Sequence, residues 1–404
     1  MHKITTKKII GQPIFSQILN LIPKQLIQEK VLERHSDKYY KGFTTIKHLI
    51  CLLFGILNKC NTLRKLCEGM LACQGKLNHF GLLQTPARST ISDANNRRSN
   101  EVFESIYFAL VEHYRGVLSD SRKIMLSIKK LFIIDSTTIH LFSNILQGVG
   151  RNPKKNGKKK GGVKVHMLID AAEDIASMVC ITAAKVHDST FLKILRLPEC
   201  SFVVFDKAYN NYKRFAEWTQ AKIYFVTRMK SNAVYQVLQI VKEESLTLIS
   251  GVKKEEIIEL KYKEKKQNKD LLLRRITYVD EQLREYVFIT NNFEISAEEV
   301  ALIYKNRWQI ELIFKKLKQN FPLKYFYGDS ENAIKMQIWC TLIANLLMMV
   351  IKQLSKTSKA FSNIVSVIRM HILSYIDVFE FLKDTFRAWK KLISSKDYQP
   401  SFFT

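Results

Sequence analysis

A run of short apolar segments between residues 130 and 227 constrains the fold more than any other feature of this sequence. Five segments have the length and composition of buried β-strands, and two stretches of helical periodicity separate the last three. The order of strand, strand, strand, helix, strand, helix, strand predicts an α/β unit with helices packed on a sheet. The predicted strands are KLFIID (130–135), GVKVHMLID (162–170), IASMVCITAAKV (175–186), SFVVFD (201–206) and KIYFVT (222–227), the second and third forming an antiparallel pair, and the helical stretches are FLKILRLP and KAYNNYKRFAEWTQ.

The segments on either side of this unit have different periodicities. Residues 1–125 have the apolar spacing of amphipathic helices and predict an all-α N-terminal domain, which we expect to bind DNA. The α/β unit occupies residues 126–228, and the charged, alternating segments of residues 229–292 predict a mainly β insertion. We expect residues 293–350 to complete the α/β unit and residues 351–404 to form a helical C-terminal region. Several units agree with the length of 404 residues, which exceeds one average domain.

The composition favours a polyanionic partner. The chain has a formal net charge of +27 and a pI of about 9.7, while 47% of its residues are apolar. A membrane surface is the competing polyanion, but the apolar run Ile338–Ile351 is shorter than the ~20 residues that span a bilayer. The N-terminus has no apolar signal-peptide core and the seven cysteines form no CxxC pair, so we expect reduced thiols and a cytoplasmic protein. Nucleic acid is therefore the expected partner.

Two basic segments are candidates for DNA contact. The stretch NILQGVGRNPKKNGKKKGG (144–162) lacks the GxxxxGK[ST] pattern of a P-loop, and its charge fits a flexible loop that contacts phosphates. The alternative is a solvated hairpin. The segment RSTISDANNRRS (88–99) has the composition of a helix that reads DNA, and equally of a solvated surface helix. The candidate residues are Lys154, Lys155, Lys158, Lys159 and Lys160 in the first segment and Arg97 and Arg98 in the second.

Three carboxylates are candidates for one metal site. Asp135 and Asp206 each end a predicted strand and would lie at the same edge of the sheet if those strands are neighbours. Glu311 lies on a predicted helix that opens with a capping box formed by Ser296 and Glu299. Converging carboxylates repel one another, and two Mg²⁺ or Mn²⁺ ions would relieve that repulsion and promote phosphoryl transfer. The alternative is that the aspartates only cap turns.

Three further side chains share a face with Glu311. At about 100° per residue, Tyr304, Arg307, Glu311 and Lys318 fall within one strip about 60° wide, beside the apolar face of the helix. The alternative is that Arg307 and Glu311 form an i,i+4 ion pair that only helps to solubilise the helix.

The spacing of these four residues matches a known signature. Tyr304–x2–Arg307–x3–Glu311–x6–Lys318 resembles the YREK signature of bacterial insertion-sequence transposases of the DDE type. The segments FIIDSTTIH, GVKVHMLID, KVHDS, FDKAY and FVTRMKSN resemble those that surround the first two aspartates in that family, and IIGQPIFSQ and RSTISDANNRR resemble a helical domain that precedes the core in one branch of it. The resemblance covers nearly the whole chain and is specific, because four residues recur at three fixed spacings.

The resemblance implies a fold, an activity and a set of ligands. The fold would be a ribonuclease H-like catalytic core with a mainly β insertion, preceded by the all-α N-terminal domain. Asp135, Asp206 and Glu311 would bind Mg²⁺, with Mn²⁺ as an alternative. The chain would cut the ends of an insertion sequence and join the 3′-hydroxyl ends to target DNA, as a homodimer on double-stranded DNA that includes the terminal inverted repeats.

The basic residues near the carboxylates would then bind DNA. Arg307 and Lys318 would hold phosphates of the element's end, and the Tyr304 hydroxyl would donate to a phosphate or pack. Arg228 and Lys230, just past a strand end, are further candidates for contact with the DNA backbone.

Two other functional classes compete with this interpretation. One is a transposase-derived DNA-binding regulator without catalysis, which would have lost a carboxylate. The other is a ribonuclease H-type nuclease without strand transfer, for which the long helical N-terminal domain has no clear use. We expect His187 and Asp188 to be structural or to support the site.

Overall fold

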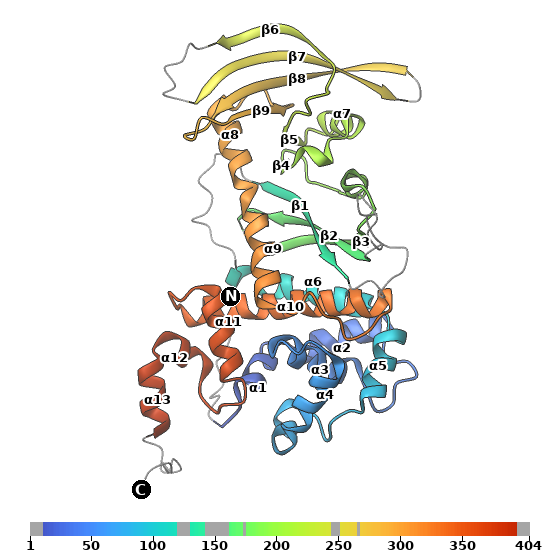
Figure 1. The fold of residues 1–404 in the computed structure, drawn as a ribbon, viewed down its shortest axis with the longest axis vertical. Helices are drawn as coiled ribbons and strands as arrows, with labels where there is room; N and C mark the ends of the chain where they lie inside the picture. The colour runs from blue at the N-terminus through green and yellow to red at the C-terminus, as the bar shows by residue number, and fades with distance from the viewer. Residues whose placement is uncertain are drawn as a thin grey trace, which may run out of the picture. The chain divides into compact units, whose positions relative to one another are not determined.

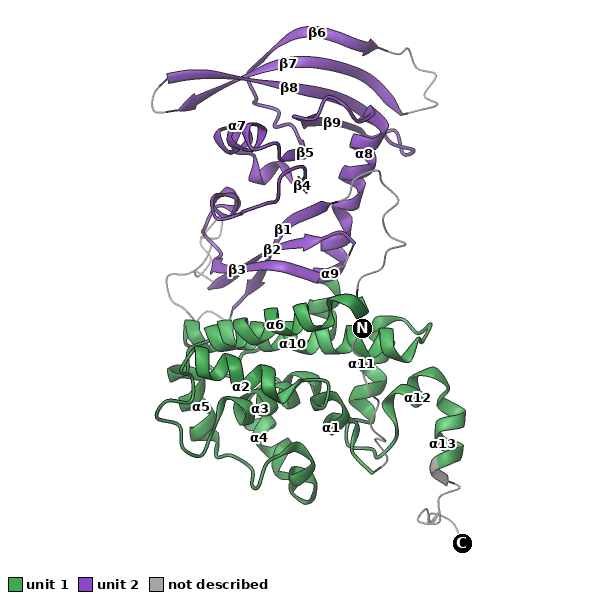
Figure 2. Ribbon diagram, turned by 180° about the vertical axis from the view of Figure 1, so that it is seen from behind, with its two compact units in different colours: residues 1–119, 144–146, 315–404 green, residues 120–143, 147–314 purple. Residues whose placement is uncertain are grey.

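The computed structural model divides the chain into two compact units, which Figure 2 colours separately. Unit 1 comprises Met1–Ser119, Asn144–Leu146 and Lys315–Thr404, and unit 2 comprises Asp120–Ser143 and Gln147–Phe314. Unit 1 is helical and unit 2 contains a large mixed sheet, so the predictions of a helical N-terminal region and an α/β region are confirmed. The residue bounds of the five predicted parts stay a prediction. The structure describes residues 11–118, 130–141, 161–172, 175–243, 251–264 and 267–393.

Unit 2 is built on one nine-stranded sheet with the order β3-β2-β1-β4-β5-β9-β8-β7-β6 (Figure 1). β1 pairs antiparallel with β2 and parallel with β4, and β5 is parallel to β4. All five predicted strands are present, and the predicted antiparallel pair is β2 with β3. The strands are β1 (Leu131–His140), β2 (Gly162–Asp170), β3 (Ile175–Ala183), β4 (Phe202–Phe205), β5 (Tyr224–Arg228), β6 (Tyr235–Glu243), β7 (Val252–Glu264), β8 (Gln267–Val279) and β9 (Glu285–Thr290).

The predicted β insertion supplies strands β6 to β9. Its last strand, β9, pairs antiparallel with β5, so the insertion continues the sheet of the preceding strands. The two parts also share one hydrophobic core, in which Ile258 and Leu273 of the insertion pack in the same cluster as Phe205 and Trp218. Burial of aromatic side chains such as these is a large stabilising contribution to folding.

The helices of unit 2 differ from the sequence prediction at FLKILRLP and at Arg307, where the single helix expected from about Ala297 onward is divided into α8 and α9. Of the predicted helix FLKILRLP (191–198), only residues 191–193 are helical, as the end of the 3-10 helix η3 (Asp188–Lys193). The capping box at Ser296 and Glu299 is present and starts α8. The remaining elements are η4 (Lys207–Tyr209), α7 (Tyr212–Gln220), α8 (Ala297–Asn306) and α9 (Trp308–Asn320), which continues into the residues of unit 1.

Unit 1 is organised around one long apolar helix, α10 (Glu331–Ser355), which packs on α6 and α3. α10 is long and apolar enough to cross a membrane by length and composition, but it is mostly buried inside this unit and is therefore a core helix. The other helices are α1 (Ile14–Leu19), α2 (Lys24–Glu33), α3 (Thr45–Leu57), α4 (Leu63–Leu71), η1 (Gln74–Phe80), α5 (Arg88–Arg97), α6 (Glu101–Leu118), α11 (Phe361–Met370), α12 (Val378–Lys383) and α13 (Thr385–Ile393).

Candidate active site

The register of two parallel strands brings Asp135 and Asp206 to the same level of the sheet. Ile134 of β1 lies opposite Phe205 of β4. Asp135 is the residue after Ile134, and Asp206 is the residue after Phe205. β4 ends there, and Asp206 caps η4 by accepting a hydrogen bond from the backbone N–H of Ala208 at 3.0 Å. β1 instead continues past Asp135 to His140 because β2 still pairs with it, so Asp135 lies within a strand and not at its end as predicted.

Arg307 joins Asp135 to Glu311. It lies between α8 and α9 with helical backbone angles, φ −53° and ψ −29°, and only 8% of it is exposed. Its Nη1 donates to Asp135 Oδ2 at 3.1 Å, and its Nη2 donates to Glu311 Oε1 at 2.6 Å. The i,i+4 pair that the sequence offers is therefore present, but the same guanidinium also reaches across to the sheet. This second contact distinguishes Arg307 from a solubilising surface residue.

The pKa values of the two aspartates are shifted in opposite directions. Burial, together with the neighbouring Glu311 and Asp206, raises the pKa of Asp135 to about 6 against the opposing effects of the Ser136 N–H and Arg307. Burial also opposes ionisation of Asp206, but the Ala208 N–H and Arg228 outweigh it and hold the pKa of Asp206 below its ordinary value. Arg228, the last residue of β5, donates from Nη2 to Asp206 Oδ2 at 2.8 Å.

The three carboxylates have the ligand chemistry that a hard divalent cation prefers. Within the described part of the chain, no three Asp, Glu, His or Cys side chains converge as a ready-made metal site. The positive charge between Asp135 and Glu311 comes instead from the Arg307 guanidinium. Carboxylate oxygens are the ligands that Mg²⁺ and Mn²⁺ prefer, and Asp135 is influenced by both of the other carboxylates. Asp135 therefore lies close enough to Asp206 and Glu311 for the three carboxylates to form an acidic centre, in which Arg307 is the cation that contacts Asp135 and Glu311.

Tyr304 packs between the two arginines of the site. Its ring centroid lies 5.9 Å from the guanidinium carbon of Arg228 and 5.7 Å from that of Arg307, and Phe288 packs against it at 4.8 Å. Contacts of this kind hold guanidinium groups over an aromatic face. The ring of Tyr304 therefore packs against both arginines, which is one of the two roles predicted for this residue.

A second polar layer, which the sequence analysis did not identify as a group, lies behind Asp135. Ser136 donates from Oγ to Asp188 Oδ1 at 2.8 Å, and Lys164 Nζ contacts the same oxygen at 3.0 Å. His166 Nδ1 lies 3.8 Å from it, and burial lowers the pKa of His166 to about 4. Lys164 and His166 are two residues apart on an otherwise apolar strand and so share a face. That alternation is the sequence signal from which Lys164 and His166 could have been predicted as a pair.

The other predicted DNA contacts are scattered. Lys230 is half-buried just beyond β5, and Lys318 is exposed in the last turn of α9. Arg97 is exposed at the end of α5, with Asp93 at 3.8 Å. These residues stay candidates for DNA contact, while the five candidate lysines of the basic segment, Lys154 to Lys160, lie outside the described residues.

The assignment of Arg98 to DNA contact is corrected. Only 1% of Arg98 is exposed, and its Nη2 donates to the backbone oxygen of Phe43 at 2.6 Å. Its Nη1 lies 3.0 Å from His48 Nδ1, and its guanidinium stacks over the ring of Tyr40. A guanidinium enclosed in this way cannot contact a phosphate, so Arg98 is a structural residue of unit 1.

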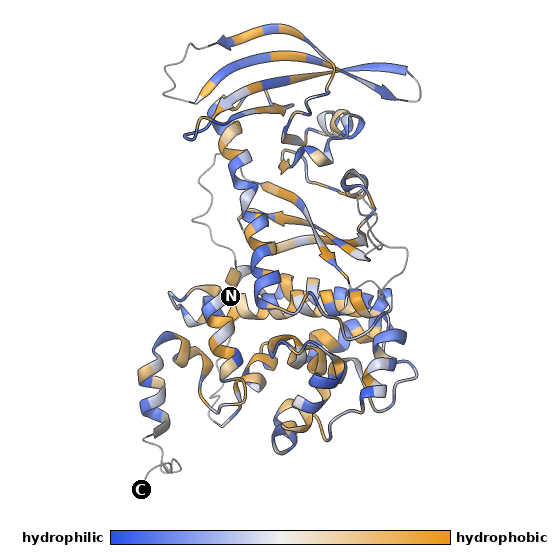
Figure 3. Ribbon diagram, viewed as in Figure 1, coloured by the Kyte–Doolittle hydropathy of each residue, from blue (hydrophilic) through white to orange (hydrophobic). Residues whose placement is uncertain are grey.

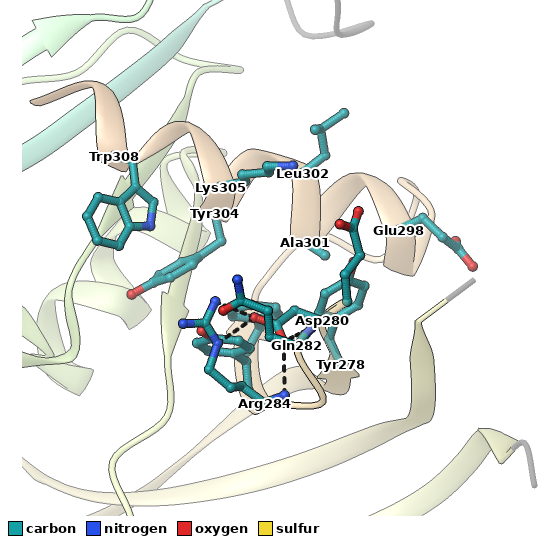
Figure 4. A pocket seen from close by; sticks show the side chains of 13 residues that line it. Tyr278, Asp280, Gln282, Arg284, Glu298, Ala301, Leu302, Tyr304, Lys305 and Trp308 are labelled. Carbon is teal, nitrogen blue, oxygen red and sulfur yellow. Dashed lines mark hydrogen bonds and ion pairs between the residues drawn. The ribbon is translucent and has the colours of Figure 1, made fainter. Parts of the chain in front are cut away.

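A pocket of about 430 Å³ opens beside the acidic centre within unit 2 (Figure 4). Its walls come from α8, the first residue of α9 and the β8–β9 hairpin, and include Tyr278, Arg284, Tyr304, Lys305 and Trp308. Tyr304 and Trp308 also lie against the guanidinium of Arg307. Two residues of the pocket wall therefore contact Arg307, which does not itself line the pocket.

The fold and the site define an α/β protein with an acidic, arginine-bridged centre. Comparison with known families agrees, because residues 127–347 match the family described as transposase DDE domain, which is more than half of the chain. The chain therefore belongs to the DDE transposase family. Residues 10–83 also match a domain of unknown function (DUF4372).

Curated relatives carry the same description. The chain is 29% identical over 278 residues to the putative transposase y4zB of Sinorhizobium fredii, an alignment that covers 67% of this chain and 73% of the relative. It is 27% identical over 269 residues to a putative transposase for insertion sequence element IS4SA of Synechocystis, with 64% and 70% covered. It is also 27% identical over 224 residues to a probable transposase for insertion sequence element IS5377 of Geobacillus stearothermophilus, with 54% and 56% covered.

Proposed function

We propose that this chain cuts the ends of an insertion sequence and joins the 3′-hydroxyl ends to target DNA by two-metal phosphoryl transfer. The observation that carries the proposal is the bridge of Arg307 to both Asp135 and Glu311, beside Asp206. It joins acidic residues from two segments that are far apart in a chain whose family is that of DDE transposases, and Arg228 holds the third, Asp206. Family membership and the intact carboxylates also favour this function over that of a regulator without catalysis.

The arrangement of β1 to β5 supports a ribonuclease H-like core. The strand order β3-β2-β1-β4-β5 combines an antiparallel β3-β2-β1 ribbon with two strands that are parallel to β1. Asp135 lies on the central strand and Asp206 follows its parallel neighbour, so backbone pairing fixes their separation. A side chain held by a strand is positioned more accurately than one held by a loop.

In this proposal Asp135, Asp206 and Glu311 hold Mg²⁺ or Mn²⁺. When bound, the ions supply activation of a water or a 3′-hydroxyl and stabilisation of the leaving oxygen. Arg228 keeps Asp206 ionised. Its guanidinium lies 2.8 Å from the Asp206 carboxylate and helps to hold the pKa of that carboxyl below its ordinary value. Once another cation neutralises Asp135 and Glu311, the Arg307 guanidinium can release these carboxylates and donate its hydrogen bonds to a DNA phosphate instead.

The partner in this proposal is double-stranded DNA, including terminal inverted repeats and target DNA, bound by a homodimer in the cytoplasm. The net charge of +27 supports a polyanion. The proposed phosphate contacts are Arg97, Arg228, Lys230, Lys318, the Tyr304 hydroxyl and the basic segment at 144–162.

The test uses three single variants, Asp135→Asn, Asp206→Asn and Glu311→Gln. We expect each to abolish cleavage of a supercoiled plasmid that carries both ends of the element with Mg²⁺, and to retain DNA binding. Asp170→Asn is the matched control, because Asp170 also ends a strand but caps a turn through the Ala172 N–H. Cleavage that survives any of the three substitutions would contradict the proposal, and cleavage without joining to a second plasmid would indicate a nuclease.

A further inference from the structure

The sheet in unit 2 ends on an apolar strand at its outer edge. β6 ends the strand order and pairs only with β7 among the described strands (Figure 1). Exposed edge strands expose unpaired backbone N–H and C=O groups and act as templates for pairing with another chain. Four apolar residues of β6 are between 41% and 51% exposed, namely Val237, Leu238, Ile240 and Val241.

Two β-bulges in β6 determine which of its side chains lie on which face of the sheet. Val237 and Gln239 lie opposite the consecutive β7 residues Ile258 and Ile257, so Leu238 is an extra residue on β6. Ile240 and Lys242 lie opposite Glu256 and Glu255 in the same way, which makes Val241 the second extra residue. Strand partners share a face, and alternate residues of β7 point to one side. Val237 and Ile240 therefore lie on one face, and Gln239 and Lys242 lie on the other.

The order of residues along β6 reads the same in both directions. From Gln236 to Lys242 it is polar, apolar, apolar, polar, apolar, apolar, polar, centred on Gln239. Figure 3 shows two hydrophobic bands on this strand separated by a hydrophilic one. In an antiparallel pair of two such strands about a two-fold axis at Gln239, Val237 lies opposite Val241, Leu238 opposite Ile240, and Gln236 opposite Lys242. Each cross-strand pair then matches apolar with apolar or polar with polar.

The charge of β6 also distinguishes it from the rest of the chain. β6 has one Lys and one Glu and is neutral, whereas the whole chain has a net charge of +27. Two copies with that charge repel each other, so close approach is least costly through a neutral surface. A neutral apolar strand is also a poor surface for phosphates. These features favour a second copy of this chain over DNA as the occupant of the edge.

We propose that two copies of this chain pair through β6, antiparallel and about a two-fold axis at Gln239. The pairing joins the two nine-stranded sheets edge to edge and leaves both acidic centres outside the interface strand. It rests on the homodimer part of the proposed function. Its test measures self-association without DNA or cleavage, so failure of this pairing and failure of the catalytic proposal are distinguishable.

The first experiment measures the mass of the full-length protein without DNA, by light scattering at increasing concentration. We expect a monomer–dimer equilibrium, and we expect Ile240→Lys to raise its dissociation constant at least tenfold. Leu272→Lys is the matched control, because Leu272 is 49% exposed on the inner strand β8 and Ile240 is 51% exposed on β6. A monomer at every concentration, or an equal effect of the two substitutions, would overturn the proposal.

The second experiment tests the register. Only residue 239 lies opposite itself in the proposed pair, where Cα atoms are about 4.5–5.5 Å apart and within reach of a disulfide. In a Cys200→Ser background, which removes an exposed cysteine, Gln239→Cys should form a covalent dimer under mild oxidation much faster than Gln236→Cys. Equal rates for the two cysteine variants would exclude this register, whatever the mass measurement gives.

Discussion

At the scale of single residues, Arg307 decides how the acidic centre behaves without a metal. It is almost fully buried and donates to carboxylates from both the sheet and α9. A buried carboxylate that loses its charged partner bears its full desolvation cost. Arg307 is therefore both a stabilising residue and, in the proposed function, a phosphate ligand.

Removal of Arg307 should separate these two roles. With a chelator present, we expect Arg307→Ala to lower the free energy of unfolding by about 1–3 kcal/mol, since Asp135 stays buried without its partner. We expect Arg307→Lys to slow DNA cleavage roughly tenfold or more, because an ammonium cannot reproduce the two-pronged geometry of a guanidinium. Thermal denaturation and a plasmid cleavage assay measure the two effects.

The control for the effect on stability is Arg97→Ala. Arg97 and Asp93 are also an i,i+4 pair, but both side chains are exposed, so the substitution should change stability by less than about 0.5 kcal/mol. If Arg307→Lys retained full cleavage across a range of salt, the contact with Asp135 would have no role in the reaction.

At the scale of elements, the junction of α3 and α5 should make unit 1 sensitive to acid. Arginine only donates, so His48 Nδ1 accepts from Arg98 and His48 Nε2–H donates to Asn95 Oδ1 at 2.8 Å. This fixes a neutral tautomer, and burial, followed by the charge of Arg98, lowers the pKa of His48 to about 3. Between pH 3 and about 6.5 the unfolded chain binds a proton at His48 that the folded chain does not bind.

Unit 1 should therefore lose stability as the pH falls below about 6.5, by roughly 1.4 kcal/mol for each pH unit from this residue. Urea unfolding followed by helical circular dichroism between pH 7 and pH 5 measures that slope. His48→Gln, which keeps a donor and an acceptor but does not titrate, should flatten it. His113→Gln, an exposed position on α6, should not change it, and equal slopes for wild type and His48→Gln would contradict the assignment.

The sequence predicted the elements better than their partners. The strands around Asp135 and Asp206, the β insertion and the capping box at Ser296 follow from local periodicity and capping chemistry, and all are present. The pairing of β9 with β5 depends on residues far apart in the chain, which periodicity does not report. Arg98 could not be assigned from sequence for the same reason, since its acceptors are in Ser36, Phe43 and His48.

The contacts of the candidate site could also be predicted only in part from the sequence. Spacing placed Arg307 and Glu311 one helical turn apart, and that pair is present. The contact of Arg307 with Asp135 and the layer behind it through Ser136 and Asp188 required the fold. The roles of these residues in binding metal and DNA stay predictions.

At the scale of the whole molecule, positive charge should dominate the affinity for DNA. Replacing Lys154, Lys155, Lys158, Lys159 and Lys160 with alanine should weaken binding to any duplex equally. For every phosphate that is no longer neutralised, the slope of log affinity against log salt concentration should fall by about 0.9. Fluorescence anisotropy with the element's end and with an unrelated duplex measures both slopes. An unchanged slope would mean that these lysines do not bind phosphates.

The path of the chain through the two units has a consequence for synthesis. Unit 1 is assembled from both ends of the sequence, and unit 2 lies between them. A ribosome releases α3 and α6 long before α10, the helix that covers them. The nascent chain must therefore expose the apolar faces of its first helices while the whole sheet is being translated, and unit 2 can fold before unit 1 is complete. A premature stop after residue 314 would release a chain that contains all of unit 2 but lacks α10, on which α3 and α6 pack.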